Sequence, residues 1–417
     1  MTRGKKKRNE EVSSMSNRRC RRRTEKPRHL YLVLDDWSWG YSIRKIDLSD
    51  DPRLQLIAEG LAPGRNICTS RYRLPPPFFR FQAQRSEPKY IAGAFESKIL
   101  AMQSLIGPKF WEGVHVYDVR NQSFMFAGQR WPVMLKPIYI PVGDWLFVLT
   151  AGSFIRLKQP SFNKCGLPYE LPKPTFQTDH VISYAIHPNE RTIFVSIGGS
   201  VDSATFCFDM AQDEWAQHGQ WQLPFIGRGY FDPELDAWVG LSSVVGTFGH
   251  LCSCDLAPCP YEVPFHMGAT HKCPDLKISK EKLFSEVAAE RHIGVTLVYM
   301  GGGSRFCLLE CIRLQADLAD EPTVGLVDEV NEDSVNVVNE DSVSVVNEDS
   351  SISVVNPHSV TLVNEKYGMH FLKLTTFSLK YDKIGNLTTG NSRCVRYYSL
   401  PQKVTKPMLE HPVAFWM

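Results

Sequence analysis

Residues 192–210 read TIFVSIGGSVDSATFCFDM: an apolar segment, a glycine pair, and a second apolar segment that ends at Asp209. Short apolar segments separated by turn residues indicate two β-strands joined in a hairpin. The same ending, an aspartate after an apolar strand, occurs at Asp118 and Asp255. Asp118 and Asp209 are separated by about two periods of 45–50 residues, and Asp209 and Asp255 by about one such period. This spacing is typical of repeated multi-stranded units. The sequence therefore predicts an all-β fold, a β-propeller.

Other strand pairs extend this pattern along the chain. We predict six more, at residues 29–36 with 41–48, 98–102 with 114–118, 145–149 with 154–157, 238–241 with 251–256, 295–299 with 306–314, and 369–374 with 377–381. Some pairs can merge into one unit, so we expect six or seven four-stranded blades. Helical periodicity is best developed over residues 280–290, which we expect to form a helix in a loop between blades.

The charge of the chain divides it into a tail and a body. Of 417 residues 43% are hydrophobic, enough for a large core, and the net charge is only +2. Residues 1–28 contain twelve lysines and arginines against three glutamates, so this segment carries +9 and the remainder −7. We predict a disordered basic tail over residues 1–28 and a propeller over residues 29–417.

The basic tail contains two clusters of cationic residues. They comprise Lys5, Lys6, Lys7 and Arg8, then Arg18, Arg19, Arg21, Arg22 and Arg23. Two such clusters on a flexible spacer predict a two-part nuclear import signal that binds an import receptor. We therefore expect a nuclear protein, with the cytoplasm as a second location. The alternative is a general polycation that contacts nucleic acid or anionic lipid. Nucleic acid is a weaker partner hypothesis than the import receptor, and we expect no membrane partner.

An acidic repeat interrupts the predicted propeller near its end. The motif VNEDSV begins at Val330 and returns in similar form at Val338 and Val346. We interpret residues 317–358 as an acidic insertion, mostly disordered, in a surface loop. A functional acidic contact is the alternative.

The sequence lacks the motifs of common enzymes and cofactor sites. It has no G-x-S-x-G elbow, P-loop, dinucleotide fingerprint or H-E-x-x-H, so we expect no catalytic residue and no cofactor. It has no apolar run of eighteen or more residues and no apolar signal region, so we expect no membrane partner. We expect the repeated aspartates to fix loops at strand ends, and Trp131, Trp215 and Trp221 to pack between blades.

The residues between 250 and 273 include several potential zinc ligands. These are His250, Cys252, Cys254, Cys259, His266, His271 and Cys273. The spacing lacks facing C-x-x-C knuckles, and two of the cysteines occupy alternate positions of a predicted strand. We therefore expect buried cysteines and surface histidines rather than a metal site, with zinc as the alternative.

One unit resembles a kelch repeat. Gly198 and Gly199 form its glycine pair, Asp209 ends its aromatic strand, Trp215 follows, and Leu-Pro stands at residues 223–224. The resemblance implies a kelch-like propeller in which these residues are structural, as are Asp118 and Asp255 in the other units. Most other units lack the glycine pair and the tryptophan.

Three segments resemble a family of uncharacterised plant proteins that is expanded in the grasses. Residues 29–48 read HLYLVLDDWSWGYSIRKIDL, and the likeness continues through residues 97–102 and 116–118. The chain is similar to the family catalogued as domain of unknown function 1668, over residues 29–400. The resemblance implies a plant protein of kelch-like form and supplies no catalytic residues.

The functional expectation follows from repeated blades without a catalytic set. We expect a non-enzymatic protein-interaction scaffold whose partner is unknown. Arg228, Tyr230, Trp37 and Trp39 are candidates for its contact surface. The alternative is an enzyme or carbohydrate-binding protein that uses the central channel of the propeller. A weaker alternative is nucleic-acid contact through the basic tail.

Overall fold

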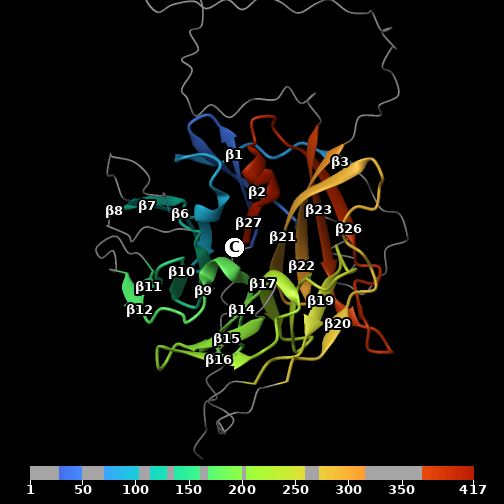
Figure 1. Ribbon diagram of the computed structural model, residues 1–417. Coiled ribbons are helices and arrows are strands. Elements are labelled where there is room, and N and C mark those ends of the chain that lie inside the picture. The colour runs from blue at the N-terminus through green and yellow to red at the C-terminus, as the bar shows by residue number, and fades with distance from the viewer. Residues whose placement is uncertain are drawn as a thin grey trace, which may run out of the picture.

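The chain folds into a ring of small β-sheets (Figure 1). The computed structural model describes residues 28–48, 70–102, 113–128, 136–159, 168–199, 203–258, 272–314 and 369–417. The described residues form six four-stranded antiparallel units, two of which join into one eight-stranded sheet. The prediction of an all-β propeller is confirmed. The acidic insertion and all of the basic tail except Arg28 lie outside the described residues.

The units follow one another along the chain, and each begins with its innermost strand except the first. Unit 1 contains β27 (Val413–Trp416), β1 (Leu30–Trp37), β2 (Gly40–Ile46) and β4 (Phe79–Gln82); unit 2 contains β5 (Ile91–Ala94), β6 (Lys98–Met102), β7 (Gly113–Asp118) and β8 (Ser123–Gly128); unit 3 contains β9 (Ile138–Val142), β10 (Trp145–Leu149), β11 (Phe154–Lys158) and β12 (Tyr169–Leu171). Unit 4 contains β13 (Val181–Ile186), β14 (Thr192–Ile197), β15 (Ala204–Asp209) and β16 (Glu214–Gly219); unit 5 contains β17 (Phe225–Asp232), β18 (Ala237–Ser242), β19 (Leu251–Cys254) and β20 (Leu276–Ile278); unit 6 contains β21 (Glu290–Gly301), β22 (Arg305–Leu314), β23 (His370–Ser378) and β26 (Cys394–Ser399).

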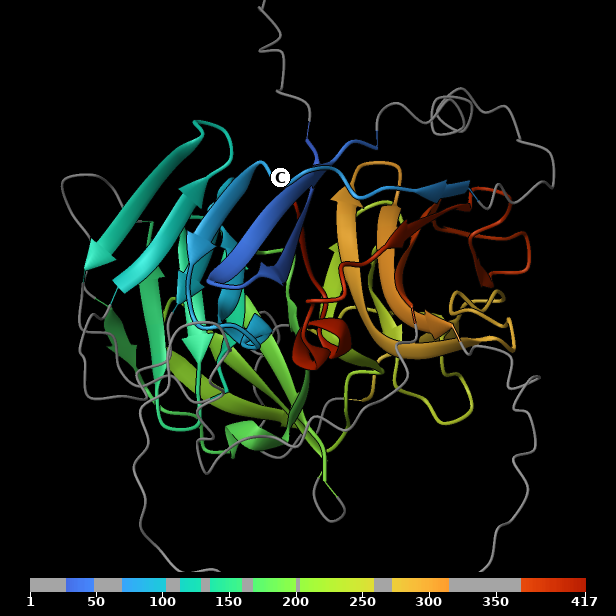
Figure 2. The ribbon, with the colours of Figure 1, turned by 90° about the horizontal axis from the view of Figure 1, so that it is seen from above.

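The C-terminal strand closes the ring. β27 pairs antiparallel with β1 in the register Leu30↔Trp416 to Val33↔Val413, and two backbone hydrogen bonds of 2.7 and 3.1 Å join His29 to Met417. Figure 2 shows this C-terminal segment beside the blue β1. The first unit is therefore assembled from both ends of the chain, which removes an exposed sheet edge.

A second contact spans the same closure at the outer edge of the ring. β3 (Ser70–Tyr72) comes from the connection between β2 and β4, yet it pairs in parallel with β26 of unit 6. In Figure 2 the blue β3 lies against the red β26. The first and last units are thus linked twice: the segment that follows unit 6 supplies the inner strand of unit 1, and a segment of unit 1 extends the outer edge of unit 6.

The core lies between neighbouring units. Middle strands such as β10 and β15 are buried on both faces, because each is covered by the sheets on either side. Between units 3 and 4, Phe154 meets Phe208 edge to face at 4.8 Å between ring centroids. Between units 4 and 5, the indole of Trp238 donates a 2.9 Å hydrogen bond to the carbonyl of Ile186. Aromatic packing with a satisfied polar group holds adjacent units at a fixed angle.

Two sequence predictions about the later part of the chain are wrong. Residues 280–290 form no helix, because Leu283 and Phe284 are buried in an irregular segment that packs against unit 6. The predicted pair at 369–374 and 377–381 forms no separate unit, since β23 continues to Ser378 and pairs with β22. The five-residue α2 (Lys406–Glu410) precedes β27, and no helix within the described ranges is long and apolar enough to cross a membrane.

Candidate functional site

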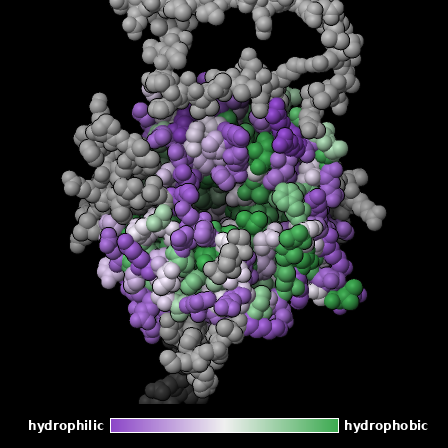
Figure 3. Space-filling model, viewed as in Figure 1, coloured by the Kyte–Doolittle hydropathy of each residue, from purple (hydrophilic) through white to green (hydrophobic). Residues whose placement is uncertain are grey.

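The innermost strands of all six units surround a central cavity of about 500 Å³. β5, β9, β13, β17, β21 and β27 each contribute lining residues, most of them apolar. In Figure 3 this face of the molecule is hollowed at its centre, and hydrophobic side chains border the hollow. A concave, mainly apolar cavity with a few polar groups is the usual form of a ligand site.

Arg228 reaches this cavity from a bulge in β17. The pairing of β17 with β18 shifts register between Ile226 and Tyr230, and residues 227–229 pair instead with β13 in parallel. Gly227 adopts φ +71°, a conformation that favours glycine. A Cβ on Gly229 would lie 2.2 Å from the ring of Phe225. The two glycines therefore permit a bulge that redirects the arginine between them.

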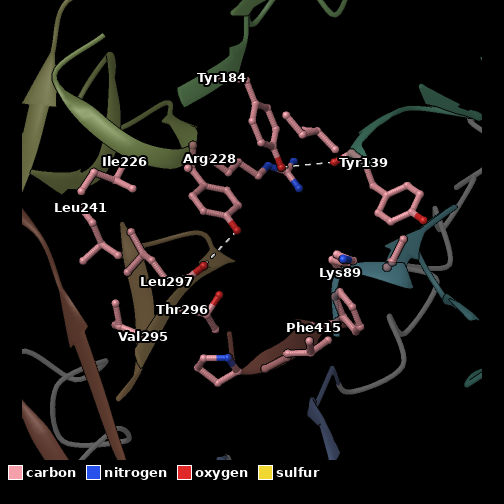
Figure 4. Close-up of a pocket in the computed structure, with 18 of the residues that line it drawn as sticks. Lys89, Tyr139, Tyr184, Ile226, Arg228, Leu241, Val295, Thr296, Leu297 and Phe415 are labelled. Carbon is pink, nitrogen blue, oxygen red and sulfur yellow. Dashed lines mark hydrogen bonds between the residues drawn. The ribbon is translucent and has the colours of Figure 1, made fainter. Parts of the chain in front are cut away.

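Arg228 has no anionic partner among the described residues. Its guanidinium lies over the ring of Tyr230, 4.7 Å from the centroid. Its buried Nε makes no hydrogen bond, and no other hydrogen bond or ion pair joins its side chain to the described part of the chain. Figure 4 shows Arg228 and Tyr184 pointing into the same part of the cavity, with Lys89 and Phe415 on the opposite wall.

Two tyrosines on either side of Arg228 are held by backbone carbonyls. The hydroxyl of Tyr184 donates to the carbonyl of Tyr139 at 3.2 Å, and that of Tyr230 donates to the carbonyl of Leu297 at 3.0 Å. Burial raises the pKa of Tyr184 to about 12, although Arg228 opposes the shift, and burial also raises the pKa of Tyr230. Both phenols are therefore neutral near pH 7 and stabilise the wall of the cavity rather than neutralise the arginine.

The remaining polar groups of the cavity include Lys89, two histidines and two hydroxyl side chains, and none is acidic within the described residues. Lys89 pairs with Glu87 at 3.4 Å, half-exposed. His250 contacts the carbonyl of Ser279 through Nδ1 at 2.8 Å. No aspartate or glutamate is among the described residues that line the cavity. Arg228 is therefore the one lining cation that no carboxylate of the described residues neutralises, because the charge of Lys89 is offset by Glu87.

A buried glutamate lies behind the wall of unit 6. Glu310 accepts hydrogen bonds from His292 at 3.0 Å and from Lys373 at 3.1 Å, and also from the amide of Ser285. Burial would raise the pKa of this carboxyl, but the hydrogen bonds from His292, Lys373 and Ser285 outweigh it and lower the pKa. Lys373 therefore balances the charge of this carboxylate locally. The hydrogen bond from His292 to Glu310 fixes the imidazole at the cavity wall.

Exposed apolar side chains stand at the mouth of the cavity on unit 5. Val245 is 98% exposed, Phe248 63%, Ile226 59% and Val244 38%. Ile226 and Phe248 also line the cavity, and Val244 and Val245 occupy the same β18–β19 loop as Phe248. We call these four residues the rim patch. Grouped apolar side chains beside a cavity mark a contact surface more often than single ones do.

The strand-end aspartates differ in their contacts. Asp118 accepts hydrogen bonds from the amides two and three residues further on, at 2.9 and 3.3 Å, and pairs with Lys98. Asp209 accepts a 2.8 Å hydrogen bond from the amide two residues on. Asp232, which the sequence analysis did not select, binds two such amides at 3.0 Å. Asp255 is exposed, and its carboxylate makes no hydrogen bond or ion pair within the described residues.

The kelch-like residues of unit 4 have distinct environments. A Cβ on Gly198 would lie 3.1 Å from Ile182, whereas one on Gly199 would meet nothing within 4 Å. The indole of Trp215 donates a 3.1 Å hydrogen bond to the carbonyl of Pro172 and packs between units 3 and 4. Neither glycine nor tryptophan reaches the central cavity.

The cysteine and histidine cluster is divided by the fold. Cys252 and Cys254 are buried in β19, where burial raises the pKa of both thiols. Cys273 is exposed, and His250 turns to the cavity. Cys259, His266 and His271 lie outside the described residues, as do Trp131 and the two clusters of tail cations. Over the described ranges, no group of three or more potential ligands is placed to hold a metal ion.

Sequence reasoning proposed Arg228 and Tyr230 as contact residues but not their place in the channel. Trp37 and Trp39 lie instead at the β1–β2 turn, away from the cavity lining. The signal that identifies the site is the Gly-Arg-Gly sequence at 227–229 within an apolar strand. Glycines on both sides of a long cation indicate a bulge that presents it.

The comparisons with known proteins describe a fold and a family. Structural matches include a crystal structure of a nidogen/laminin complex (TM-score 0.37, 10% identity, 69% of this chain and 88% of the other), a Lactobacillus plantarum protein (0.39, 11%, 89% and 98%) and TolB from Acinetobacter baumannii (0.31, 12%, 74% and 68%). Likenesses at this level carry no argument about function. Comparison with curated proteins finds no match. The sequence model of one family matches residues 27–397. Because that match covers most of the chain, the protein belongs to the family described as "Protein of unknown function (DUF1668)".

Proposed function

We propose that this protein is a non-enzymatic interaction scaffold that binds a partner protein at the rim patch. The observation that supports the proposal is the exposure of Ile226 and Phe248, which line the cavity, and of Val245 in the same loop as Phe248. Val245 is almost fully exposed and contributes little to the fold, so stability does not account for an apolar residue there. Burying such side chains against a partner contributes about 25 cal/mol for each Å² removed from water.

The partner should present apolar side chains flanked by acidic groups. Arg228 gives the neighbouring cavity a positive charge that no carboxylate offsets within the described residues, whereas Lys89 pairs with Glu87. Complementary charge accelerates association and excludes partners of the wrong sign. A basic or wholly polar surface would therefore bind poorly at this rim.

Proximity labelling in plant cells with the full chain tests this proposal. Wild type, Val245→Asp and Ile384→Asp are compared, because Ile384 is also highly exposed, at 83%, but lies in the turn after β24 (Lys380–Tyr381). We expect Val245→Asp to lose specific labelled proteins that wild type and Ile384→Asp retain. Each candidate is then purified and its affinity for the three chains is measured.

Two results count against the scaffold proposal. One is an unchanged set of labelled proteins, with unchanged affinities, in Val245→Asp. The other is reproducible turnover of a small molecule by the purified chain, which would favour the alternative of a channel enzyme. A carbohydrate ligand that binds without turnover would support the channel as a sugar site instead.

We also propose that residues 1–28 bind an import receptor and direct the protein to the nucleus. The support is the charge of +9 in two clusters, which suits two acidic grooves of one receptor. Deleting residues 1–28 should move the protein to the cytoplasm, as fluorescence microscopy would show. If the chain without residues 1–28 stays nuclear, this proposal is overturned. If the full chain binds DNA or RNA, and this binding weakens steeply with salt and is lost when residues 1–28 are deleted, the nucleic-acid alternative is supported.

A further inference from the structure

We infer that the central cavity is a binding site for a small organic carboxylate, with Arg228 as its anchor. This goes beyond a scaffold role, since the ligand would enter the channel itself rather than rest on the rim patch. Three features of the described residues carry the inference: the unpaired arginine, the bulge that presents it, and the apolar walls around it.

The charge of Arg228 is the first feature. A guanidinium carries five donors in a planar fork and remains charged at every physiological pH. Arg228 is partly buried, and its Nε is removed from water without a partner, whereas proteins normally pair buried groups of this kind because leaving them unpaired is costly. The contact of Arg228 with the Tyr230 ring offsets part of this cost but accepts no hydrogen bond in the guanidinium plane. A bound carboxylate would supply two acceptors in that plane.

The bulge is the second feature. Regular pairing of β17 with β18 would bond residues 227–229 to β18, but these residues pair with β13 in parallel. The parallel register places Arg228 opposite Tyr184, whose hydroxyl is fixed on the carbonyl of Tyr139. Rigid strands of units 3, 4 and 5 therefore hold the groups around the guanidinium before any ligand arrives. Such preorganisation lowers the entropic cost of binding.

The walls of the cavity are the third feature. Ile138, Leu297, Val295 and Phe415 come from three different units and present apolar surface to the space beside the arginine. The volume of about 500 Å³ lies within the usual range for small-molecule sites, about 300–1,000 Å³. These walls suit an apolar or aromatic body, while the absence of a lining carboxylate among the described residues avoids repulsion of its anionic end.

Binding of 2-naphthoate, compared with neutral 2-naphthamide, tests the inference on the full chain. The two probes share a ring body and differ in charge, and titration calorimetry reports their affinities. We expect saturable binding of 2-naphthoate and at least tenfold weaker binding of 2-naphthamide. Arg228→Met should weaken 2-naphthoate at least tenfold and leave 2-naphthamide unchanged, because only the charge-assisted hydrogen bonds are lost.

Three variants control the measurement. Arg80→Met removes an exposed arginine of β4 and should leave 2-naphthoate affinity unchanged. Arg228→Lys keeps the charge without the planar fork and should give an intermediate affinity, which also serves if Arg228→Met fails to fold. Val245→Asp, at the rim patch, should bind 2-naphthoate with the same affinity as wild type. The scaffold proposal can therefore fail while the carboxylate site is still detected, and the reverse also holds.

Each contrary result overturns the inference. If the folded wild-type chain binds neither probe, the cavity is not a carboxylate site. If both probes bind equally, or if 2-naphthoate binds Arg228→Met and wild type alike, the cavity takes apolar bodies and Arg228 is no anchor.

Discussion

Replacing Asp35 by alanine should weaken the closure of the ring. Asp35 is fully buried at the end of β1, and its carboxylate accepts hydrogen bonds from the Thr405 amide at 3.0 Å and the Thr405 hydroxyl. It also accepts a 3.1 Å bond from the amide of Ser86. Thr405 immediately precedes α2 and is followed by β27, so this one side chain ties the C-terminal segment to β1 across nearly the whole chain.

The expected magnitude follows from the three donors. A hydrogen bond to a charged group contributes about 1.5–3 kcal/mol net, and two backbone amides would lose their acceptor, at about 1–3 kcal/mol each. Removing a buried carboxylate also relieves its desolvation cost, which offsets part of the loss. We therefore expect Asp35→Ala to lower the free energy of unfolding by about 3–5 kcal/mol, and Asp35→Asn by about half as much.

Chemical denaturation followed by tryptophan fluorescence measures this change. Asp255→Ala is the matched control, because Asp255 is exposed and has no hydrogen bond or ion pair from its carboxylate to the described residues. That control should stay within about 0.5 kcal/mol of wild type. Limited proteolysis should cut Asp35→Ala first near residues 401–412. If Asp35→Ala and Asp255→Ala have the same stability, the proposed role of Asp35 in ring closure is wrong.

Two further substitutions probe other parts of the fold. Glu310→Gln should lower the free energy of unfolding by about 3–5 kcal/mol at pH 7, because it leaves buried Lys373 without its anionic partner. Because the folded pKa of Glu310 lies below the ordinary carboxyl value of about 4.3, its contribution to stability is present above that value and is lost as pH falls through the folded pKa. The difference between the two chains in thermal melts should therefore shrink as pH is lowered below about 4.3, and a difference that stays constant contradicts this. Gly93→Val should lower the free energy of unfolding by about 1–3 kcal/mol, because a Cβ at residue 93 would lie 2.4 Å from the Phe415 ring of β27. Gly152→Ala should leave the stability unchanged in the same denaturation assay, because a Cβ there would meet nothing within 4 Å. Equal effects of the two substitutions would argue against tight packing of β27 on β5.

Local sequence patterns predicted the strands well because each hairpin depends on nearby residues. The pair at 192–210 corresponds to β14 and β15, and the turn after Asp118 is held by amides two and three residues away. The merged last unit was harder to predict. β22 and β23 are adjacent in the sheet but are separated along the chain by residues 315–369, so no local signal joins them.

Long-range pairings could not be predicted from the sequence. The register Leu30↔Trp416 joins the two ends of the body, and β3 reaches unit 6 from a connection within unit 1. The helix predicted at 280–290 fails for a related reason. Its periodic apolar residues, including Leu283 and Phe284, pack against other segments, and tertiary packing overrides local propensity.

The sequence could predict that a central cavity exists, but not which residues meet in it. A central channel follows from any propeller, but the approach of Tyr184 to Arg228 depends on the parallel pairing of β13 with β17. The Gly-Arg-Gly sequence at 227–229 indicates a bulge that exposes the arginine side chain. It does not indicate which residues of other strands face that side chain. The place of Phe248 at the cavity mouth likewise depends on its contact with Phe284, far along the chain.

Hydrogen–deuterium exchange of the full chain, with and without a purified partner, tests the scaffold role most directly. The rim patch predicts slower exchange over residues 241–250 and in β17 when the partner is bound, and unchanged exchange in the turn at residues 382–386. Protection confined to that turn or to the outer strands, with residues 241–250 unaffected, would contradict the assignment of the contact surface.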